Sequence, residues 1–174
     1  MQSHQPSARF VPPPAQTRSG GLYTEAERAR RDATVWTLVQ GILAPLQFLV
    51  FLVSLALVLR CLATGDGEFA AAASVVVKTL VLYAIMITGS IWEKVVFGRY
   101  LFAPAFFWED VVSMLVLALH TLYLAMLLFG LGSVTEQLAV ALAAYATYAV
   151  NATQFLLKLR AARLERPCLA PVPQ

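Results

Sequence analysis

Three carboxyl groups lie at the edges of a short charged segment in an otherwise apolar chain. Glu93 stands before residues 94–108, and Glu109 and Asp110 stand directly after them. A partly desolvated carboxylic acid keeps its proton near neutral pH and can donate it, while a neighbouring carboxylate can orient a water molecule. An acid at a helix N-terminus is also favourable for the helix dipole, which gives Asp110 a structural alternative. The spacing therefore indicates either acid–base chemistry or helix capping at this segment.

The segment between these acids is rich in aromatic residues. Seven of the 19 aromatic residues of the chain fall within 17 positions: Trp92, Phe97, Tyr100, Phe102, Phe106, Phe107 and Trp108. Lys94 and Arg99 add positive charge, and Pro104 forces a bend. Tryptophan and tyrosine are ordinary membrane-surface anchors, but so many rings predict a wide apolar platform at the water edge. A platform beside cations suits a flat hydrophobic ligand with an acidic group.

Two ionisable residues, His120 and Lys78, fall inside long apolar stretches. His120 follows Glu109 by 11 residues, about three helical turns, so both lie on nearly the same helix face. A neutral imidazole in a membrane can ligate a metal or move a proton; the alternative is a hydrogen bond to a neighbouring helix. Lys78 either extends to the membrane surface or needs an anionic partner in the bundle. A single membrane histidine excludes a haem held by two histidines of one chain, and no Cys/His cluster has zinc spacing, so the protein is expected to have no metal site of its own.

The helices that position these residues are expected to be apolar, because the composition of the chain is that of a membrane protein. Of the 174 residues, 59% are hydrophobic and 13% are charged, and the mean hydropathy is +0.70. A soluble domain rarely has this balance. Four stretches reach the roughly 20 residues that a helix needs to cross a bilayer. The sequence thus predicts an all-α integral membrane protein, a bundle of four transmembrane helices at residues 35–60, 70–92, 110–131 and 137–158.

Each predicted helix carries one mildly polar stripe. In helix order the stripes are Gln40, Gln47 and Ser54; Thr79, Tyr83, Met86, Ser90 and Glu93; Glu109, Ser113, Val116 and His120; and Thr147, Asn151, Gln154 and Lys158. Because polar groups are poorly tolerated against lipid, the four stripes are expected to face one another. They either join the helices by hydrogen bonds or line a polar pocket that opens towards the cytoplasm.

The distribution of lysine and arginine predicts the orientation of the bundle. Five of these residues precede the first predicted helix, two lie in residues 93–109 and four lie at the C-terminal end, whereas Arg60 alone lies on the opposite side. Both termini and the aromatic segment are therefore expected in the cytoplasm. Cys61 and Cys168 then lie on opposite sides, which excludes a disulfide between them. The net charge of +3 fits anionic lipid headgroups, and no basic stripe indicates nucleic-acid binding.

The chain divides into four parts. They are a disordered lead, a basic juxtamembrane segment, the four-helix membrane domain with its aromatic cytoplasmic segment 93–109, and a loose tail, at residues 1–23, 24–34, 35–164 and 165–174. In the juxtamembrane segment, Thr24 is expected to cap a short helix together with Glu27. The first apolar run is too long and starts too late for a cleaved signal peptide.

Long contiguous stretches of the chain resemble one known family. The stretches are WTLVQGILAPLQFLVFLVSLALVLR, VVKTLVLYAIMITGSIWEKVVFGRYLFAPAFFWEDVVSMLVLALHT and LAAYATYAVNATQFLLKLRAARL. From Arg31 to Leu164 the sequence is similar to the 3-vinyl bacteriochlorophyllide hydratase family of photosynthetic bacteria. The resemblance implies a hydro-lyase that adds water to the C3 vinyl group of chlorophyllide a or 3-vinyl bacteriochlorophyllide a, giving a 3-(1-hydroxyethyl) group. It also implies a place in the bacterial inner, photosynthetic membrane, with lipid and other pigment-synthesis enzymes as neighbours.

Vinyl hydration requires a proton on the terminal carbon and a water molecule on the inner carbon. For this chemistry Glu109 is the expected acid, and Asp110 or Glu93 is expected to orient the water. His120 is expected either as an axial ligand to the magnesium ion of the pigment or as a second proton carrier. Hydration moves no electrons, so no cofactor is expected.

With such a pigment as the ligand, the residues of the aromatic segment indicate how it is held. Lys94 or Arg99 is expected to bind its propionate group, and the rings expected to contact the macrocycle are Trp92, Trp108, Tyr100 and Phe107. A non-catalytic pigment carrier or assembly factor would use the same rings and histidine without needing several carboxyl groups. A small transporter would instead need a charged path through the membrane.

Overall fold

The structure is a computed structural model that describes residues 22–164. Within this range all regular secondary structure is helical: α1 (Glu25–Ala33), α2 (Val35–Thr64), α3 (Glu68–Phe97), α4 (Phe107–Phe129) and α5 (Val134–Leu164). The prediction of an all-α protein is confirmed for these residues, and the four helices α2 to α5 are long and apolar enough to cross a membrane. The predicted tail and all but the end of the predicted lead lie outside the described residues.

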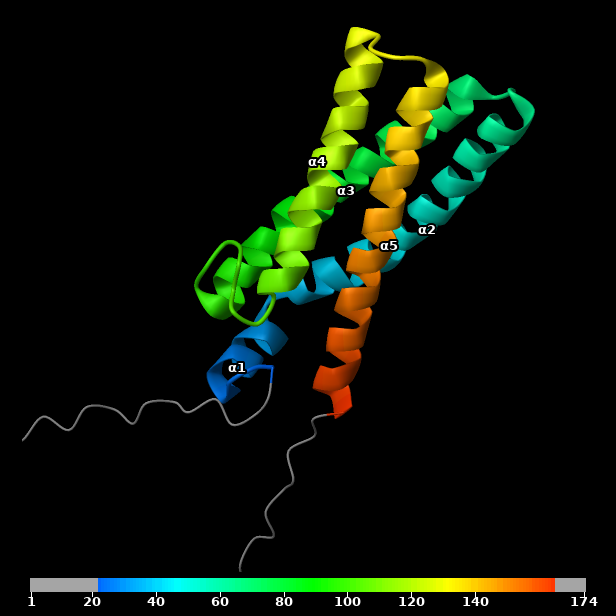
Figure 1. Ribbon diagram of the computed structural model, residues 1–174. Coiled ribbons are helices and arrows are strands. Elements are labelled where there is room, and N and C mark those ends of the chain that lie inside the picture. Colours follow the sequence, from blue (N-terminus) through cyan, green and yellow to red (C-terminus); the bar gives the residue numbers. More distant parts are fainter. Residues whose placement is uncertain (1–21, 165–174) are drawn as a thin grey trace, which may run out of the picture.

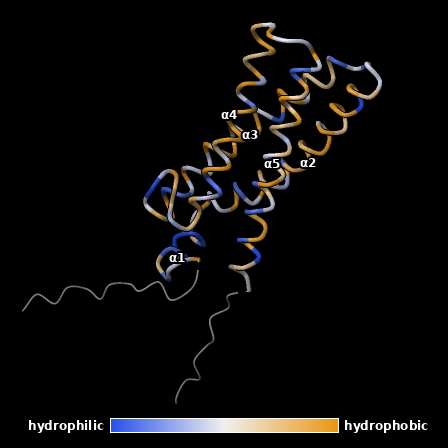
Figure 2. Tube along the Cα trace, viewed as in Figure 1, coloured by the Kyte–Doolittle hydropathy of each residue, from blue (hydrophilic) through white to orange (hydrophobic). Residues whose placement is uncertain are grey.

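The four long helices form two antiparallel hairpins, α2–α3 and α4–α5, that pack against each other (Figure 1). One end of the bundle holds α1, the 98–106 connection and the last turns of α5, and is called the α1 end. The other holds the short turns 65–67 and 130–133 and is called the hairpin end. Apolar residues follow the long helices, and hydrophilic residues gather at α1 and the adjacent connection (Figure 2). This distribution suits a bundle whose middle is surrounded by hydrocarbon.

Helices α2 and α3 extend beyond the predicted spans and meet in a tight turn. Helix α2 ends at Thr64 instead of position 60, and α3 begins at Glu68. Gly65 and Gly67 adopt left-handed conformations, with φ of 76° and 84°, which lets the chain reverse within three residues. Hydropathy locates the part of a helix that crosses the membrane, but the glycines determine where the helix itself ends.

The polar stripes face the interior of the bundle. Their buried members include Gln47, Ser54, Thr79, Ser113 and Asn151. Gln40 Nε2 donates to Thr88 Oγ1 at 2.7 Å within the α2–α3 hairpin, and Ser54 Oγ lies 2.6 Å from Tyr145 Oη, which joins the two hairpins. For Gln40 and Ser54 the stripes connect helices by hydrogen bonds, one of the two interpretations that the sequence leaves open.

Helix α1 begins with the capping box that the sequence predicts. Thr24 N donates to Glu27 Oε2 at 2.7 Å, and Glu27 N donates to Thr24 Oγ1 at 3.3 Å. Arg30 Nε donates to the Val96 carbonyl at 2.8 Å and ties α1 to α3. Tyr23, which the sequence assigns to the lead, is buried, and burial raises the pKa of its hydroxyl. The packed part of the chain therefore includes Tyr23.

Candidate active site at the α1 end

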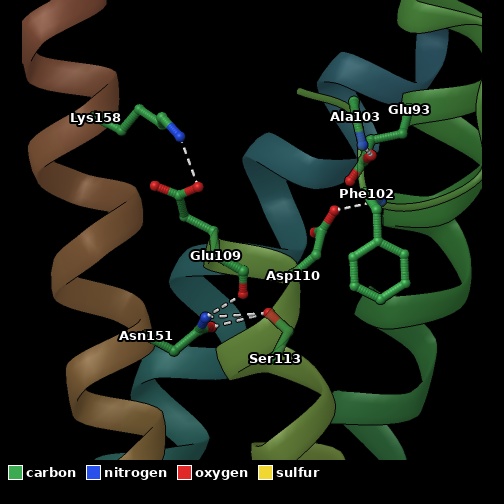
Figure 3. A network of polar contacts seen from close by, with 8 residues as sticks. All are labelled: Glu93, Phe102, Ala103, Glu109, Asp110, Ser113, Asn151 and Lys158. Atoms are coloured by element: carbon green, nitrogen blue, oxygen red, sulfur yellow. Dashed lines mark hydrogen bonds and ion pairs between the residues drawn. The ribbon is translucent and has the colours of Figure 1, made fainter. Parts of the chain in front are cut away.

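Three buried carboxyl groups meet at the α1 end. Glu93 lies near the end of α3, and Glu109 and Asp110 lie in the first turn of α4; their exposed fractions are 5%, 7% and 4%. The 98–106 connection folds back over them and brings acids that are distant in sequence into one region (Figure 3). The structure thus gathers the acids that the sequence singles out.

Glu109 forms an ion pair between two helices. Lys158 Nζ of α5 donates to Glu109 Oε2 at 2.6 Å. Asn151 Nδ2 donates to the Glu109 carbonyl at 2.9 Å and to Ser113 Oγ at 3.0 Å (Figure 3). The sequence places Lys158 on the polar stripe of its helix, seven residues after Asn151, but does not identify it as a site residue. That stripe is the signal by which it could have been found.

Asp110 and Glu93 hold the 98–106 connection in place. Asp110 Oδ2 accepts a hydrogen bond from Phe102 N at 2.7 Å, and Glu93 Oε2 accepts one from Ala103 N at 3.2 Å (Figure 3). Phe102 has a φ of 58°, a left-handed conformation that costs a non-glycine residue about 1–3 kcal/mol. The two acceptors stabilise the backbone at this strained residue. The Asp110 side chain therefore supports the connection and does not cap α4, whose N-cap residue has no side-chain capping bond.

The carboxyl groups of Glu93 and Asp110 lie near each other, because they bind the adjacent backbone amides of Ala103 and Phe102. Two carboxylates in contact repel strongly, whereas one proton held between them forms a hydrogen bond. Both groups are buried, and the nearby ammonium of Lys158 is bound to Glu109. This pair is therefore suited to hold a proton beneath Phe102.

The predicted aromatic platform divides into two sets of rings, of which the inner set is packed inside the α1 end. Phe106 is 2% exposed and contacts Trp92, Phe97 and Phe155 at ring-centroid distances of 5.7, 5.8 and 5.9 Å. Tyr23 stacks on Phe97 at 5.8 Å. The prediction of a platform at the water edge is therefore wrong for Phe106, because rings from α3, α5 and the start of the chain cover it. Trp92, expected to contact the ligand, belongs to this packed set.

The outer set of rings is accessible and is called the exposed aromatic surface. It consists of Tyr100, Phe102, Phe107 and Trp108, which are 61%, 38%, 44% and 69% exposed. The Phe107 ring lies 5.8 Å from Phe102 and 5.5 Å from Trp108. Lys94 Nζ lies 5.2 Å from the Tyr100 ring, and Arg99 is exposed next to Tyr100 in the chain. These rings and cations are the part of the predicted platform that a ligand can reach.

His120 lies in the middle of the bundle, apart from the three acids. Eleven helical residues separate it from Glu109, about 16 Å along α4. The side chain is fully buried, and Nδ1 lies 2.8 Å from the Val116 carbonyl oxygen. Nε2 has no hydrogen-bond partner among residues 22–164. The structure therefore does not bring His120 together with the acids that the sequence groups with it.

Lys78 does not reach the membrane surface. Its side chain is fully buried, and Nζ lies 3.8 Å from the centre of the Tyr148 ring. Nζ has no hydrogen-bond partner within the described part of the chain. The interpretation that this ammonium extends to the surface is wrong, because Tyr148 of α5 packs over it.

Comparison with known proteins identifies the family. Residues 23–161 match the family model described as 2-vinyl bacteriochlorophyllide hydratase. The chain belongs to this family. The 2-vinyl bacteriochlorophyllide hydratase of Cereibacter sphaeroides is 69% identical over 144 residues, covering 83% of this chain and 89% of that protein; that of Rhodobacter capsulatus is 68% identical over 144 residues, covering 83% and 84%. No solved structure matches the chain.

The family match extends over the α1 end and the interior of the bundle. It begins at Tyr23 and includes the acids, the exposed aromatic surface, His120 and Lys158. The resemblance to the hydratases is thereby confirmed. In the span between residues 22 and 164, no group of three or more His, Cys, Asp or Glu side chains is placed to hold a metal ion.

Proposed function

We propose that this protein adds water to the C3 vinyl group of a chlorophyllide-type tetrapyrrole and forms a 3-(1-hydroxyethyl) group in bacteriochlorophyll biosynthesis. Position 3 in systematic numbering is position 2 in the older numbering of the family name. The observation that carries this proposal is the identity of 68–69% to two proteins named as hydratases of this vinyl group. The reaction is that of a hydro-lyase. It transfers no electrons and needs no redox cofactor.

The exposed aromatic surface is the proposed binding surface for the macrocycle. Its rings present apolar faces, and a conjugated macrocycle that stacks on them removes apolar area from water. Tyr100, Phe107 and Trp108 are the expected ring contacts that remain accessible. Lys94 and Arg99 bind the propionate, which is ionised in a chlorophyllide because it carries no phytyl ester.

The proton is proposed to come from the Glu93–Asp110 pair. The sequence favours Glu109 as the acid, but a carboxylate bound to an ammonium at 2.6 Å loses that ion pair when it is protonated. Among the described residues the adjacent pair forms no ion pair, and it can hold a proton between its two carboxyl groups. Glu109, as a carboxylate, orients the attacking water.

The proposed reaction is balanced within this site. A carboxyl proton moves to the terminal vinyl carbon, which leaves a cation on the inner carbon that the conjugated macrocycle stabilises. The oxygen of water bonds to the inner carbon, and a water proton returns to the carboxylate that acted as the acid. The pair thus ends in its starting protonation state, and one water molecule is consumed. Residues 102–103 lie over the acids, so movement of the 98–106 connection admits the vinyl group.

The α1 end is proposed to face the cytoplasm in the inner, photosynthetic membrane. This end carries the lysine and arginine residues of α1, of the region from Lys94 to Arg99 and of the end of α5, whereas Arg60 lies near the hairpin end. Cytoplasmic ends of membrane helices are enriched in these residues. In this orientation the pigment and its neighbouring synthesis enzymes share one membrane surface.

The proposed function is tested with membranes that contain the protein and are incubated with chlorophyllide a, followed by chromatography of the pigments. The wild type is expected to form a more polar, water-added product. Asp110→Asn and Glu93→Gln are expected to lose most of this product, because an amide cannot replace the acid. Glu68→Gln is the matched control, since it makes the same chemical change at an exposed position of the hairpin end.

Two other results would change the proposal. Product formation by Asp110→Asn at the wild-type rate, with loss in a parallel Glu109→Gln variant, would transfer the acid role to Glu109. Absence of product from the wild type, with pigment still co-purifying, would favour the alternative of a non-catalytic pigment carrier or assembly factor.

A further inference from the structure

Three buried side chains in the middle of the bundle carry polar atoms without a hydrogen-bond partner in the described residues. They are Gln47 of α2, Lys78 of α3 and His120 of α4, which are 2%, 0% and 0% exposed, and they are called the central cluster. Buried polar groups are nearly always hydrogen-bonded, because an unpaired one costs free energy. Unpaired donors and acceptors from three helices therefore indicate a place for a ligand.

The packing of the helices places the three groups close together. Hydrogen bonds at Gln40 and Ser54 fix the antiparallel register of α2 and α3, in which Gln47 lies less than one turn from Lys78 along the bundle. Lys78 Nζ lies on the Tyr148 ring and His120 lies beside the Tyr145 ring, and both tyrosine rings contact Phe51, at 4.9 and 5.5 Å. The central cluster is thus one site and not three separate groups.

His120 is held in the tautomer that a metal ligand needs. Its Nδ1 lies 2.8 Å from the Val116 carbonyl oxygen, which can only accept a hydrogen bond, so the ring proton is on Nδ1. Nε2 then carries a free lone pair. A histidine whose other nitrogen donates to a backbone carbonyl is the usual arrangement of a metal ligand, because that bond fixes both tautomer and ring orientation.

Within the described helices, Lys78 has no acidic partner at its depth. Within α3, Glu68 lies ten residues before it and Glu93 lies 15 residues after it, which is about 15 Å and 22 Å along the helix. The other acids of the described helices lie at the two ends of the bundle. The Tyr148 ring offers only a cation–π contact. A buried ammonium without a counter-charge is costly, so an anionic group is the ligand that it favours.

The central cluster lies where the two hairpins meet. Gln47 and Lys78 belong to the α2–α3 hairpin, whereas His120 and Tyr148 belong to the α4–α5 hairpin. Near the cluster the hairpins are joined by the hydrogen bond between Ser54 and a tyrosine of α5. The cluster is enclosed between the hairpins, so a flat ligand reaches it only when the hairpins separate.

We propose that the central cluster binds the pigment at a second position, with His120 Nε2 on its magnesium ion and the Lys78 ammonium on its propionate group. The inference takes its ligand from the proposed function and adds a holding position inside the membrane. A magnesium chlorophyllide combines a Lewis acid for a neutral imidazole with a carboxylate for an unpaired ammonium. The Gln47 amide can donate to a ring carbonyl of the same molecule.

This position is distinct from the acids of the α1 end. His120 is about 16 Å from Glu109 along α4. In the pigment, only one pyrrole ring separates the magnesium ion from the vinyl group. A pigment that is ligated by His120 therefore keeps its vinyl group away from the Glu93–Asp110 pair, and hydration and magnesium ligation occur at different positions.

The magnesium contact is tested by absorption and resonance Raman spectra of the purified protein with chlorophyllide a, since axial nitrogen ligation changes both. The wild type is expected to show five-coordinate magnesium, and His120→Leu is expected to lose this signature. Added imidazole should restore it, which separates a lost ligand from a lost fold. Tyr123→Phe, a buried change three residues away on α4, should keep the signature. An unchanged signature in His120→Leu would overturn the inference.

The carboxylate contact is tested by titrating the same spectral signature. Lys78→Met is expected to weaken the ligated form of chlorophyllide a about tenfold or more, because the propionate loses its ammonium partner. Lys78→Arg should retain most of the affinity. The methyl ester of chlorophyllide a, which has no carboxylate, should bind equally to the wild type and to Lys78→Met. An equal loss for the acid and for the ester would contradict the propionate contact.

These spectra do not depend on turnover, so the two proposals fail separately. A ligation signature that responds to His120→Leu in a protein without hydratase activity would overturn the proposed function and leave this inference intact. Hydration by a protein that shows no histidine-ligated pigment would overturn this inference and leave the proposed function intact.

Discussion

Two lysines that point into the bundle occupy opposite environments. At the α1 end, Lys158 donates to the Glu109 carboxylate at 2.6 Å, and the Glu109 carbonyl is bound by Asn151. In the middle of the bundle, Lys78 faces the Tyr148 ring, and its ammonium has no hydrogen-bond partner among the described residues. The same side chain is therefore satisfied by the protein in one region and unsatisfied in the other.

The α1 end is therefore organised before a ligand arrives and is called the organised region. The central cluster, in contrast, is completed by its ligand. The three acids of the α1 end each accept a hydrogen bond from another part of the chain, so their positions are fixed in the free protein. The 98–106 connection moves to admit the pigment, whereas the helices that carry the three acids need no rearrangement, and groups that are already in position favour catalysis. The central cluster instead gains its missing partners on binding, which favours a holding position.

The largest expected effect is on catalysis at the organised region. In Asp110→Asn the amide oxygen can still accept from Phe102 N, so the 98–106 connection is expected to keep its conformation. The amide cannot act as an acid, and loss of a general acid lowers rates by about 10²–10⁴. Initial rates of chlorophyllide a hydration in membranes measure this change. A rate within about threefold of the wild type would remove the Glu93–Asp110 pair from the chemistry.

The next largest expected effect is a difference in stability between variants of the inner rings and variants of the outer rings of the α1 end. Trp92→Ala removes a ring packed on Phe97 and Phe106 and a 3.0 Å hydrogen bond to Thr37, and is expected to lower the free energy of unfolding by about 3 kcal/mol. Trp108→Ala removes an exposed ring and should change it by less than about 0.5 kcal/mol, while weakening pigment binding. Denaturant unfolding in detergent and pigment titration measure both quantities. A reversed ranking in stability would mean that the division of the rings is incorrect.

The features that sequence alone predicts correctly are those that depend on local pattern. Apolar stretches predict the four spans, seven-residue spacing predicts that Gln47 and Ser54 share the interior face, and a threonine three residues before a glutamate predicts the α1 capping box. Each of these depends on residues within one helix, where geometry is set by the 3.6-residue repeat. The family resemblance likewise depends on contiguous residues.

The features that sequence misses depend on contacts between helices. The ion pair of Lys158 with Glu109 spans 49 positions, and Phe106 is buried by rings that come from three other parts of the chain. From its own helix alone, Lys78 is predicted either to extend to the membrane surface or to need an anionic partner, and only the packing of Tyr148 shows that it is enclosed. Partner choice across a bundle is not encoded in the spacing within one helix.

Replacing each of the two lysines by methionine has the next largest expected effect. The two replacements should change the free energy of unfolding in opposite directions. Lys158→Met leaves the buried Glu109 carboxylate unpaired and is expected to lower the free energy of unfolding by about 1–3 kcal/mol, allowing for the partial exposure of the lysine. Lys78→Met removes an unpaired ammonium and should raise it by about 1–3 kcal/mol in pigment-free protein. Thermal unfolding in detergent measures both changes.

A matched double variant distinguishes pairing from general damage in this test. Lys158→Met combined with Glu109→Gln removes both charges and should recover part of the stability that Lys158→Met loses. Destabilisation by Lys78→Met in pigment-free protein would show that its ammonium is satisfied, and the comparison of the two lysines would then fail.

The smallest expected effect tests whether α1 is a separate unit at the edge of the organised region. Thr24→Ala removes the hydroxyl that accepts from Glu27 N, keeps the backbone N–H that donates to the Glu27 carboxylate, and should lower the stability of α1 by about 1 kcal/mol. Thr153→Ala, an exposed threonine inside α5, is the control and should change stability by only a few tenths of a kcal/mol. Hydrogen exchange is expected to become faster in α1, which is tied to the bundle by the Arg30 bond to Val96 and by the Thr37 bond to the Arg31 carbonyl, and to stay unchanged around His120. Faster exchange at the central cluster as well would mean that α1 controls how the hairpins meet, so the two regions would act as one.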